Sequence, residues 1–431
     1  MADSEDGASL LVVTQYFPPE TGAPASRFDE LTKRWSESGN DVTVLTSAPD
    51  YPEGELYDGY QNEWLHRERR DGVDVVMTKT FPASNVGFFR RALKFMWFMI
   101  ISVLVGVRLE KPDVVVATSP QPLVGVSGWL VARVRRAKFV FEVRDLWPES
   151  ISAAGDVDNR LLYASLEAIS SFLYRHADRV VVVSQEFERS IVAAGASSED
   201  ILYHPNGVDV SFFEDASEPE FANRSLSDYF VVSYIGTIGR AHGLSVVLDS
   251  AAELPSESKY DDVLFLFVGF GAQAETLQRR ASEQGLDNVV FAGRRPKEEV
   301  PEFLSVSDVS LVHLKDRDLF RTVIPSKMFE SMAAGVPIVL GVKGEAKRIL
   351  TEANAGVTME PEDPQDLTSA VRHLYDESGR RTEFGSNGAD FVRENFDWDA
   401  IATEYEQDLL VLASSRTEAS EPNVGEPNNT A

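Results

Sequence analysis

The sequence predicts an α/β protein made of two doubly wound parallel sheets, each with helices on both faces. Short apolar runs of strand length alternate with helical stretches along most of the chain. This alternation pauses near residue 206 and restarts near residue 230. The 431 residues, 43% of them hydrophobic, suffice for two domains of ordinary size. Because such sheets bind ligands at the carboxyl ends of their strands, we expect the functional residues in the turns after strands.

The first domain is expected to cover residues 8–205. A strand at 10–14 is followed by a loop at 15–22 and a helix at about 25–38, which ends at Gly39. The later strands of this domain are expected at 41–46, 73–77, 113–117, 138–143 and 179–184. Their apolar runs are nearly continuous, as is usual for strands buried on both faces.

The second domain is expected to cover residues 206–395. Asn206-Gly207 is a turn dipeptide, and loop-like acidic residues continue to about position 228. A helix is expected at about 244–254, and strands are expected at 230–235, 264–268, 288–292 and 309–313. A last amphipathic helix is expected within 396–414, and the polar residues 415–431 are expected to be a disordered tail.

Composition excludes several classes of function. The net charge of -28 would repel nucleic-acid phosphates, so no nucleic-acid partner is expected. The absence of cysteine excludes disulfides, thiol catalysis and Cys-ligated metals, and the six histidines show no ligand spacing. An acidic chain with more Arg than Lys fits a halophile that balances brine with internal salt, because salt screens self-repulsion. An ordinary acidic cytosolic protein is the alternative.

One stretch, residues 88–107, bears on membranes. Its uninterrupted apolar part at 95–107 is too short to span a bilayer. Arg90, Arg91 and Lys94 form a basic cluster among aromatic residues, which is typical of an interfacial helix. A buried core helix with a basic start explains the pattern equally well, and both interpretations stay open. The acidic N-terminus shows no signal peptide, so we expect a cytoplasmic protein, peripheral on the inner face of the cell membrane.

Residues 324–340 are the most informative segment. They predict a loop, a short helix with Ser326 as its N-cap, a turn at Gly335 and a buried strand. Lys327 and Glu330 lie three residues apart and therefore share a face of this helix. A cation, a helix N-terminus and a carboxylate suit a phosphate that lies beside a sugar diol.

This segment resembles the signature of the family-four retaining glycosyltransferases, which have the GT-B fold. Glu330 matches the second Glu of that signature and is followed by the sequence Ser-Met-Ala-Ala-Gly-Val-Pro, whereas the first Glu is replaced by Thr322. The resemblance implies two domains that face a cleft and a last helix that returns to the first domain. It also implies that Glu330 holds the donor ribose and that Lys327, Arg321 and the helix start at Ser326 neutralise the leaving diphosphate.

The resemblance further implies glycine turns that let the backbone approach the donor. In this family an Arg and a Lys usually follow the first glycine of the second domain, but Thr237 and His242 stand in those places. This departure, together with Arg-Asp-Leu-Trp-Pro at 144–148, resembles a subgroup that transfers amino-sugar or fucosamine-like residues. The remaining residues implied on the donor side are Gly22, Gly236, Arg240, Gly269, Gly271 and Arg294.

On the acceptor side the resemblance points to the loop 144–149. Asp145 is the expected catalytic or orienting residue, with Arg144 and Glu149 next, and a structural ion pair is the alternative. Asp316 and Asp318 have the Asp-x-Asp spacing of a metal site. In this architecture cations and helix ends usually replace the metal, so no metal and no cofactor is expected.

These residues together predict a retaining glycosyltransferase. The donor is expected to be a nucleotide-sugar, a UDP-sugar in first place, and the acceptor a lipid-linked glycan in surface glycan, glycoprotein or polysaccharide assembly. A nucleotide-sugar epimerase of the same fold is one alternative. A non-catalytic scaffold is another, because Thr237, His242 and Thr322 replace expected groups.

Overall fold

The computed structural model describes residues 7–20, 23–51, 54–81, 88–119, 121–149, 160–214, 217, 219, 226–254 and 258–418. The chain divides into two compact units. Unit 1 contains residues 1–205 and 401–431, and unit 2 contains residues 206–400. The chain therefore passes between the units twice, after Pro205 and after Ala400.

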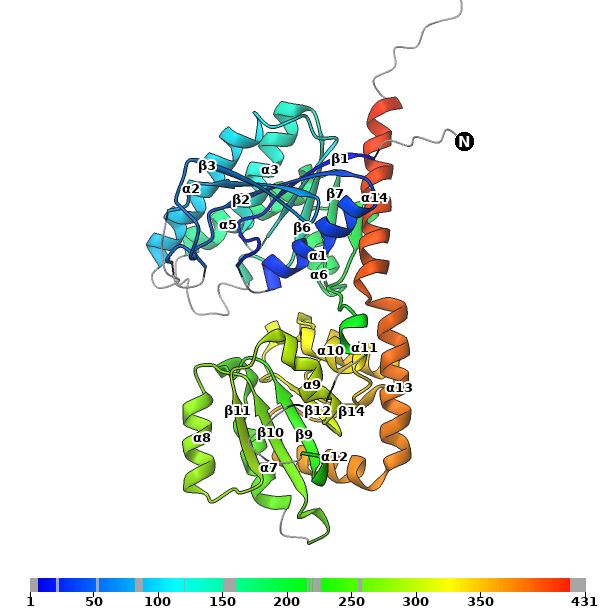
Figure 1. Ribbon diagram of the computed structural model, residues 1–431. Coiled ribbons are helices and arrows are strands. Elements are labelled where there is room, and N and C mark those ends of the chain that lie inside the picture. The colour runs from blue at the N-terminus through cyan, green and yellow to red at the C-terminus, as the bar shows by residue number, and fades with distance from the viewer. Residues whose placement is uncertain are drawn as a thin grey trace, which may run out of the picture. The chain divides into compact units, whose positions relative to one another are not determined.

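Unit 1 is built on an eight-stranded sheet with the order β3-β4-β2-β1-β5-β6-β7-β8 (Figure 1). All neighbouring strands are parallel except β3, which pairs antiparallel with β4. The order reverses between β1 and β5, so the ligand-binding position of this sheet lies at their carboxyl ends. The strands are β1 (Ser9–Val13), β2 (Asp41–Ser47), β3 (Leu65–Arg70), β4 (Val73–Thr78), β5 (Val114–Thr118), β6 (Lys138–Val143), β7 (Arg179–Val182) and β8 (Ile201–Tyr203).

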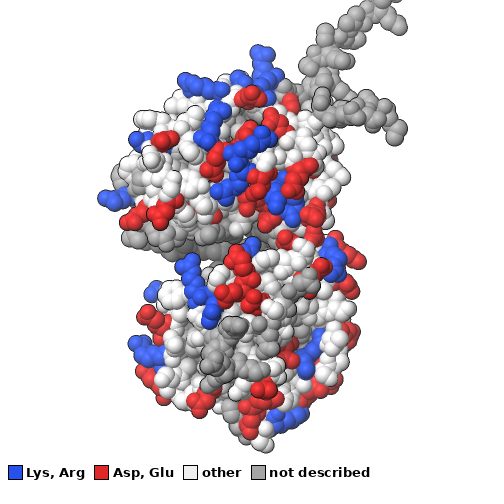
Figure 2. All heavy atoms as spheres, in the orientation of Figure 1, with Lys and Arg blue, Asp and Glu red and all other residues white. Residues whose placement is uncertain are grey.

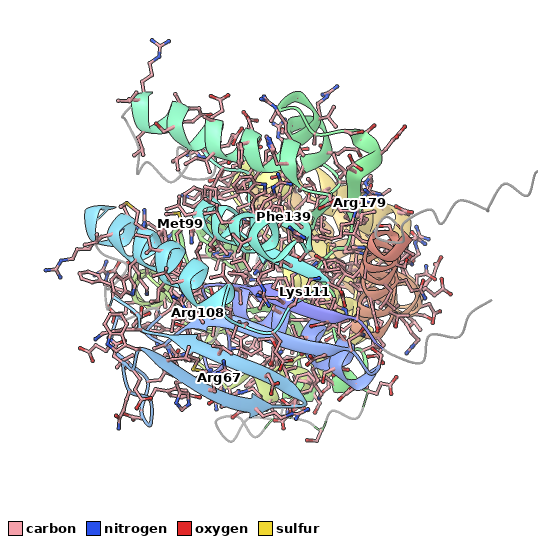
Figure 3. All side chains as sticks on the ribbon, turned by 90° about the horizontal axis from the view of Figure 1, so that it is seen from above. Arg67, Met99, Arg108, Lys111, Phe139 and Arg179 are labelled. Carbon is pink, nitrogen blue, oxygen red and sulfur yellow. The ribbon has the colours of Figure 1, made fainter. Side chains whose placement is uncertain are left out.

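The helices of unit 1 include one layer formed by α2, α3 and α5, in which α3 contacts both neighbours (Figure 3). Glycines let α3 approach the sheet, since a Cβ at Gly125 or Gly128 would collide with Phe141 or Ala117. The described helices of this unit are α1 (Ala23–Glu37), α2 (Phe88–Gly106), α3 (Pro122–Arg135), α5 (Arg160–His176), α6 (Phe187–Ala193) and the last helix, α14 (Trp398–Glu418), of which residues 401 onward belong here.

The last helix completes the core of unit 1. Tyr405 and Leu409 of α14 are buried, and the Trp35 indole of α1 donates a hydrogen bond to the Ala402 carbonyl over 3.1 Å. Beside them, the buried Arg27 guanidinium pairs with Glu142 at 3.0 Å and also donates to the carbonyl of His204. These groups come from α1, β6, α14 and the residues just before Pro205. Their contacts therefore hold in place the part of the chain that leaves unit 1.

Unit 2 has a six-stranded, all-parallel sheet with the order β11-β10-β9-β12-β13-β14. Its order reverses between β9 and β12. The strands are β9 (Phe230–Ile235), β10 (Val263–Val268), β11 (Val289–Gly293), β12 (Val309–His313), β13 (Ile338–Gly341) and β14 (Gly356–Thr358). The described α-helices are α7 (Ser245–Glu253), α8 (Ala274–Glu283), α9 (Val300–Ser305), α10 (Ser326–Ala333), α11 (Glu345–Ala353), α12 (Pro364–Asp376) and α13 (Ser378–Asn395). The predicted fold class, two doubly wound parallel α/β domains, is confirmed.

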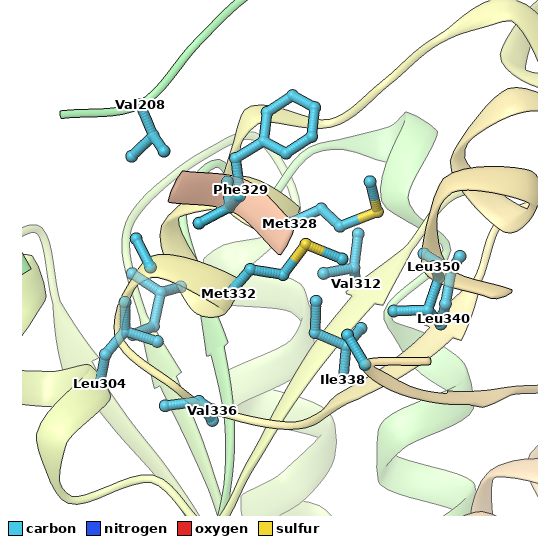
Figure 4. Packing of buried hydrophobic residues seen from close by; sticks show 14 of the residues in the cluster. Val208, Leu304, Val312, Met328, Phe329, Met332, Val336, Ile338, Leu340 and Leu350 are labelled. Carbon is cyan, nitrogen blue, oxygen red and sulfur yellow. The ribbon is translucent and has the colours of Figure 1, made fainter. Parts of the chain in front are cut away.

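Helix α10 is anchored by its apolar face in one of the cores of unit 2 (Figure 4). Met328, Phe329 and Met332 are buried there against residues of β12 and β13, such as Val312 and Leu340. The Phe329 ring also stacks on Phe396 with 4.3 Å between centroids. This packing fixes the rotation of α10 and thereby the direction of its opposite face, which carries Lys327 and Glu330.

Charged side chains of both signs are interspersed over the face of the molecule that Figure 2 shows. Several of the acidic residues are paired on the surface, for example Glu352 with Arg348 at 3.1 Å and Asp200 with Arg179 at 2.8 Å. The excess of acidic residues in the sequence nevertheless leaves a net charge of -28.

Candidate functional site

Lys327, in the first turn of α10, has a buried ammonium group that lies against an aromatic ring. Its Nζ makes no hydrogen bond among the residues that the structure describes. It lies 3.8 Å from the ring centroid of Tyr234 and against the Cα side of Gly236. Burial lowers the pKa of Lys327 from 10.5 to about 7, although the nearby Glu330 carboxylate opposes this. An anion that enters here would restore the charge and would supply the missing hydrogen-bond acceptors.

Glu330 follows one turn later and is half-buried. Burial raises the pKa of its carboxyl group, while Lys327 and Lys297 lower it. Within the described part of the chain no hydrogen bond to its carboxylate is found, so both oxygens are available to accept from ligand hydroxyls. The structure thus places Lys327 and Glu330 on one face of α10, as the sequence spacing predicted.

Helix α10 begins differently from the expectation. Ser326 was expected to be the N-cap, but Pro325 occupies that position and no side chain caps the helix. Ser326 is the first helical residue and is exposed. Since no side chain satisfies the first N–H groups, this end of the eight-residue helix retains free donors beside Lys327.

The glycine-containing turns that follow β9 and β10 pack directly against each other at the carboxyl ends of these strands. A Cβ at Gly269 would lie 1.9 Å from the Gly236 carbonyl oxygen, and a Cβ at Gly271 would lie 2.6 Å from that of Ile238. Gly236 and Gly269 have φ values of 127° and 143°, which other residues rarely adopt. The predicted donor-side glycines Gly236, Gly269 and Gly271 therefore form one interlocked surface, with Lys327 on the Gly236 side.

His242 stands where the resemblance implies a lysine, and its surroundings keep its imidazole neutral. Burial, and after it the charge of Lys327, lowers the pKa of His242 to about 4. Its Nδ1 accepts a hydrogen bond from the Gly239 N–H at 3.3 Å, which leaves Nε2 as the protonated nitrogen. His242 is therefore a neutral donor near Lys327 rather than a second cation, a role that the sequence alone did not reveal.

Tyr234 is the residue of this site that sequence reasoning missed. It lies within β9, which reads as a plain buried strand, and its ring forms the floor under Lys327. Its hydroxyl donates to the Thr237 carbonyl at 2.7 Å and thereby orders the turn after β9. No local signal distinguishes this tyrosine from core aromatics, because its role depends on a contact with residue 327.

The other predicted cations of unit 2 are on its surface. Arg240 and Arg294 are exposed, and neither has an ion pair in the described part of the chain. Arg321 is half exposed and lies 3.8 Å from Asp316 and 3.5 Å from Asp318. The Asp-x-Asp pair is therefore engaged with cations, since Asp316 also pairs with Lys343 at 2.9 Å.

The acceptor-side residues of unit 1 lie just after β6. Arg144 donates from its backbone N–H to the Ser119 hydroxyl at 2.8 Å, and its Nε and Nη1 atoms are buried without a hydrogen-bond partner among the described residues. Burial lowers the pKa of Arg144 to about 10, which Glu142 and Asp145 oppose. Asp145 and Glu149 are exposed, and neither forms an ion pair with another residue of the described ranges. Gly22 lies outside the described residues.

The basic cluster predicted at the start of α2 has only two exposed or half-exposed members, Arg90 and Arg91. Lys94 does not belong to it, because its ammonium group is buried and pairs with Asp50 of unit 1 at the carboxyl end of β2. The apolar residues of α2 divide in the same way, with Phe98 and Ile101 buried and Ile100 and Leu104 about half exposed. No helix in the described part of the chain is both long and apolar enough to cross a membrane.

Comparison with protein families gives two matches that lie one after the other. Residues 22–207 match the glycosyl transferase 4-like domain, and residues 216–391 match the glycosyl transferases group 1. The putative colanic acid biosynthesis glycosyl transferase WcaI of Escherichia coli is 23% identical over 376 residues, which are 84% of this chain and 91% of WcaI.

Solved structures show the same fold. The sucrose-phosphate synthase of Thermosynechococcus elongatus superimposes with a TM-score of 0.73 at 17% identity, over 94% of this chain and 99% of that one. HepE of Anabaena, solved in complex with UDP-glucose, gives a TM-score of 0.64 at 16% identity, over 95% and 100%. With its first part matched to a glycosyl transferase 4-like domain and its second to the glycosyl transferases group 1, the chain is a glycosyltransferase of the GT-B fold.

Proposed function

We propose that this glycosyltransferase moves a sugar from a UDP-sugar to a hydroxyl of a lipid-linked glycan, with retention of the anomeric configuration. The observation that carries the proposal is the buried Lys327 ammonium group, which lacks a hydrogen-bond partner in the described structure and lies beside Glu330 at the start of α10. A nucleoside diphosphate suits both groups. Its phosphates can pair with the Lys327 ammonium group, and its ribose hydroxyls can donate hydrogen bonds to the Glu330 carboxylate.

In this proposal unit 2 binds the donor. Glu330 accepts hydrogen bonds from the ribose, and Lys327, together with the free N–H groups of α10, binds the diphosphate. Gly236, Gly269 and Gly271 let the ligand reach the backbone, since they carry no side chains. Arg240, Arg294 and Arg321 contribute long-range attraction from exposed positions. Uracil is preferred as the base because HepE, a structural relative, is solved with UDP-glucose.

The chemical step in the proposal is electrostatic. As the bond between the sugar and the diphosphate breaks, Lys327 and the N-terminus of α10 stabilise the negative charge on the leaving oxygen. The acceptor hydroxyl attacks from the same face and passes its proton to the leaving phosphate, which accounts for retention without a covalent enzyme intermediate. Asp145, supported by Arg144 and Glu149, orients the acceptor or the donor sugar.

We further propose that no metal and no cofactor takes part. Asp316 and Asp318 are engaged with Arg321 and Lys343, and these cations compete with a metal for the carboxylates. Chelation of divalent cations should therefore leave turnover unchanged. A loss of turnover on chelation that added magnesium or manganese restores would contradict this part of the proposal.

The acceptor and location are proposed from α2 and from the relatives. Arg90, Arg91 and the exposed residues Ile100 and Leu104 suit contact with an anionic membrane surface. WcaI bears a name from colanic acid biosynthesis. We place the protein in the cytoplasm, peripheral on the inner face of the membrane, in surface glycan, glycoprotein or polysaccharide assembly, and in a cell with high internal salt.

The testing experiment measures nucleotide release from a panel of UDP- and GDP-sugars in molar KCl with membrane lipids of the source. The wild type is compared with Glu330→Ala and with Glu352→Ala, a surface carboxylate on α11 that pairs with Arg348. We expect turnover of one donor that Glu330→Ala abolishes and Glu352→Ala retains. Isomerised donor without transfer would favour the epimerase, and binding without turnover would favour the scaffold.

A further inference from the structure

Unit 1 contains an apolar cavity of about 230 Å³ between α2, the start of α3, α5 and the loop after β6. Phe95 and Met96 of α2, Trp147, and Leu166 and Ile169 of α5 line it. For scale, an apolar cavity of about 150 Å³ can hold a benzene ring. The cavity therefore has room for part of one hydrocarbon chain.

The cavity reaches the ligand-binding position of the sheet. Gln121, which lines it, follows β5, and its side-chain Nε2 donates to Gln15 after β1 at 3.1 Å. β1 and β5 are the two strands at which the sheet order reverses. The remaining amide atoms of this pair, Gln15 Nε2 and Gln121 Oε1, are buried and have no partner in the described structure. Because buried polar atoms are usually paired, this amide pair marks a polar position next to the apolar space.

Charge and position indicate what kind of polar group this is. Among the described lining residues Arg91 is the charged one, and it favours an anion at its end of the cavity. Trp147 belongs to the same loop as Arg144 and Asp145, the residues proposed to act on the acceptor side. A ligand with its chain in the cavity would therefore have this loop of unit 1 beside it.

The cavity is also continuous with an exposed apolar row on α2. Leu93, Met96, Ile100 and Leu104 are each between 39% and 49% exposed and recur at helical spacing. Met96 belongs both to this row and to the cavity lining. A chain that leaves a bilayer can thus pass along α2 into the cavity without crossing a polar surface.

We propose that this cavity binds the first part of the single hydrocarbon chain of a phosphate-linked lipid acceptor, with the phosphate beside Arg91. The inference rests on the proposed function, since it assigns the lipid end of the proposed acceptor to a place in unit 1. It adds a binding site that is separate from the donor site in unit 2 and is therefore measurable without any sugar donor.

The experiment titrates butyl, hexyl, octyl and decyl phosphate, each below its micelle concentration, and follows binding by calorimetry. Each additional buried methylene should tighten binding by about fourfold until the cavity is full. The matching alcohols should bind more weakly than the phosphates, and Arg91→Gln should remove this difference. Geranyl phosphate, compared with decyl phosphate, shows whether the cavity prefers a branched isoprenoid or a straight chain.

Two substitutions on α5 form a matched pair. Leu166→Trp fills the cavity, whereas Leu161→Trp places the same side chain at a position that is 77% exposed and outside the lining. We expect Leu166→Trp to weaken decyl phosphate binding by more than about tenfold and Leu161→Trp to leave it unchanged. The thermal midpoint and UDP affinity of both variants, measured in parallel, verify that they are folded.

The inference is overturned if affinity does not depend on chain length, or if a folded Leu166→Trp variant binds decyl phosphate like the wild type. Failure of the proposed function looks different, because it would appear as a lack of donor turnover with alkyl phosphate binding intact. Conversely, transfer to acceptors without a lipid chain at full rate, together with absent alkyl phosphate binding, would refute the cavity assignment alone.

Discussion

Lys327 holds an ammonium group against an aromatic ring and a glycine, out of reach of water. This arrangement makes the protonated form of Lys327 less favourable in the folded protein than in the unfolded chain. The pKa of its ammonium group is therefore about 7 in the folded protein and 10.5 in the unfolded chain. Between these two values the unfolded chain binds one more proton than the folded chain, so stability rises with pH in this window. An anionic ligand reverses the shift because it favours the protonated form.

This gives a prediction for donor binding. UDP affinity should fall as pH rises from about 7 to 8.5, by up to about tenfold per pH unit, because binding requires Lys327 to take up a proton. The last phosphate ionisation, near pH 6, is already complete in this range. Titration calorimetry in buffers of different ionisation enthalpy measures both the affinity and the proton uptake.

Two variants at the same position test the cause. Lys327→Arg should make UDP affinity independent of pH in this range, because arginine stays charged. Lys327→Met should bind UDP weakly at every pH, whereas Lys259→Met, which removes an exposed cation of unit 2, should behave like the wild type. An unchanged pH profile in Lys327→Arg would show that another group titrates.

At the residue scale the sequence revealed the central pair but not its surroundings. Lys327 and Glu330 could be predicted because helical spacing alone puts them on one face. Tyr234 under Lys327, and the burial of Lys94 with Asp50, depend on contacts between segments far apart in sequence. Ser326 failed as an N-cap because Pro325 already has the extended conformation that this position requires.

At the scale of elements, the interlocked turns after β9 and β10 define the surface beside α10. Gly269→Ala should lower the thermal midpoint and cost more than about 2 kcal/mol, because its Cβ would overlap the Gly236 carbonyl and its φ is 143°. UDP affinity should fall with it. Differential scanning calorimetry and UDP titration are the measurements.

Gly293→Ala is the matched control for this substitution. Gly293 also has a positive φ, of 74°, but a Cβ there meets nothing within 4 Å. It should therefore cost about 1 kcal/mol, the conformational penalty without the collision. Equal losses in the two variants would mean that backbone conformation, and not the contact between the turns, determines the effect.

The exposed row of α2 leads to a prediction about membranes. The double variant Ile100→Ser/Leu104→Ser should bind vesicles containing phosphatidylglycerol about tenfold more weakly, because both side chains are about half exposed and apolar. Neither residue lines the cavity, so alkyl phosphate binding should persist. Cosedimentation with vesicles gives the affinity, and Val411→Ser, an exposed apolar residue on α14, serves as control.

The sequence predicted those strands whose residues are mostly apolar because they are buried. The strands β1, β5, β6 and β9 appear as apolar runs because both their faces are covered. Strand β3 was missed, since Leu-His-Arg-Glu-Arg-Arg is polar and lies at the edge of the sheet. The two interpretations of α2 could not be separated by sequence because the helix has both a buried and an exposed apolar side.

At the scale of the whole molecule, the net charge of -28 predicts a strong response to salt. Raising KCl from low concentration to molar concentration should raise the thermal midpoint, with most of the gain below about 1 M, where the Debye length falls to about 3 Å. A parallel series with sucrose separates charge screening from general exclusion of solute. If the thermal midpoint does not change with KCl concentration, the net charge gives no support for adaptation to high salt.

The fold class of the whole molecule followed from the sequence because strand and helix lengths alternate through both halves. The strand orders did not, since local patterns do not say which strands pair. The reversal between β1 and β5 in unit 1, and between β9 and β12 in unit 2, became visible only in the structure. Gln15, Gln121 and Gly236 lie next to these reversals. The sequence could therefore show that such residues are in turns after strands, but it could not show which of these turns lie together.

The return of α14 to unit 1 has a consequence for synthesis on the ribosome. Tyr405 and Leu409 enter the core of unit 1, yet they are translated after all of unit 2. Unit 2 is one continuous segment and is able to finish folding while unit 1 still waits for its last helix. The nascent first half therefore stays incomplete for the whole time that residues 206–400 are made, and chaperones have the longest access to the half that was translated first.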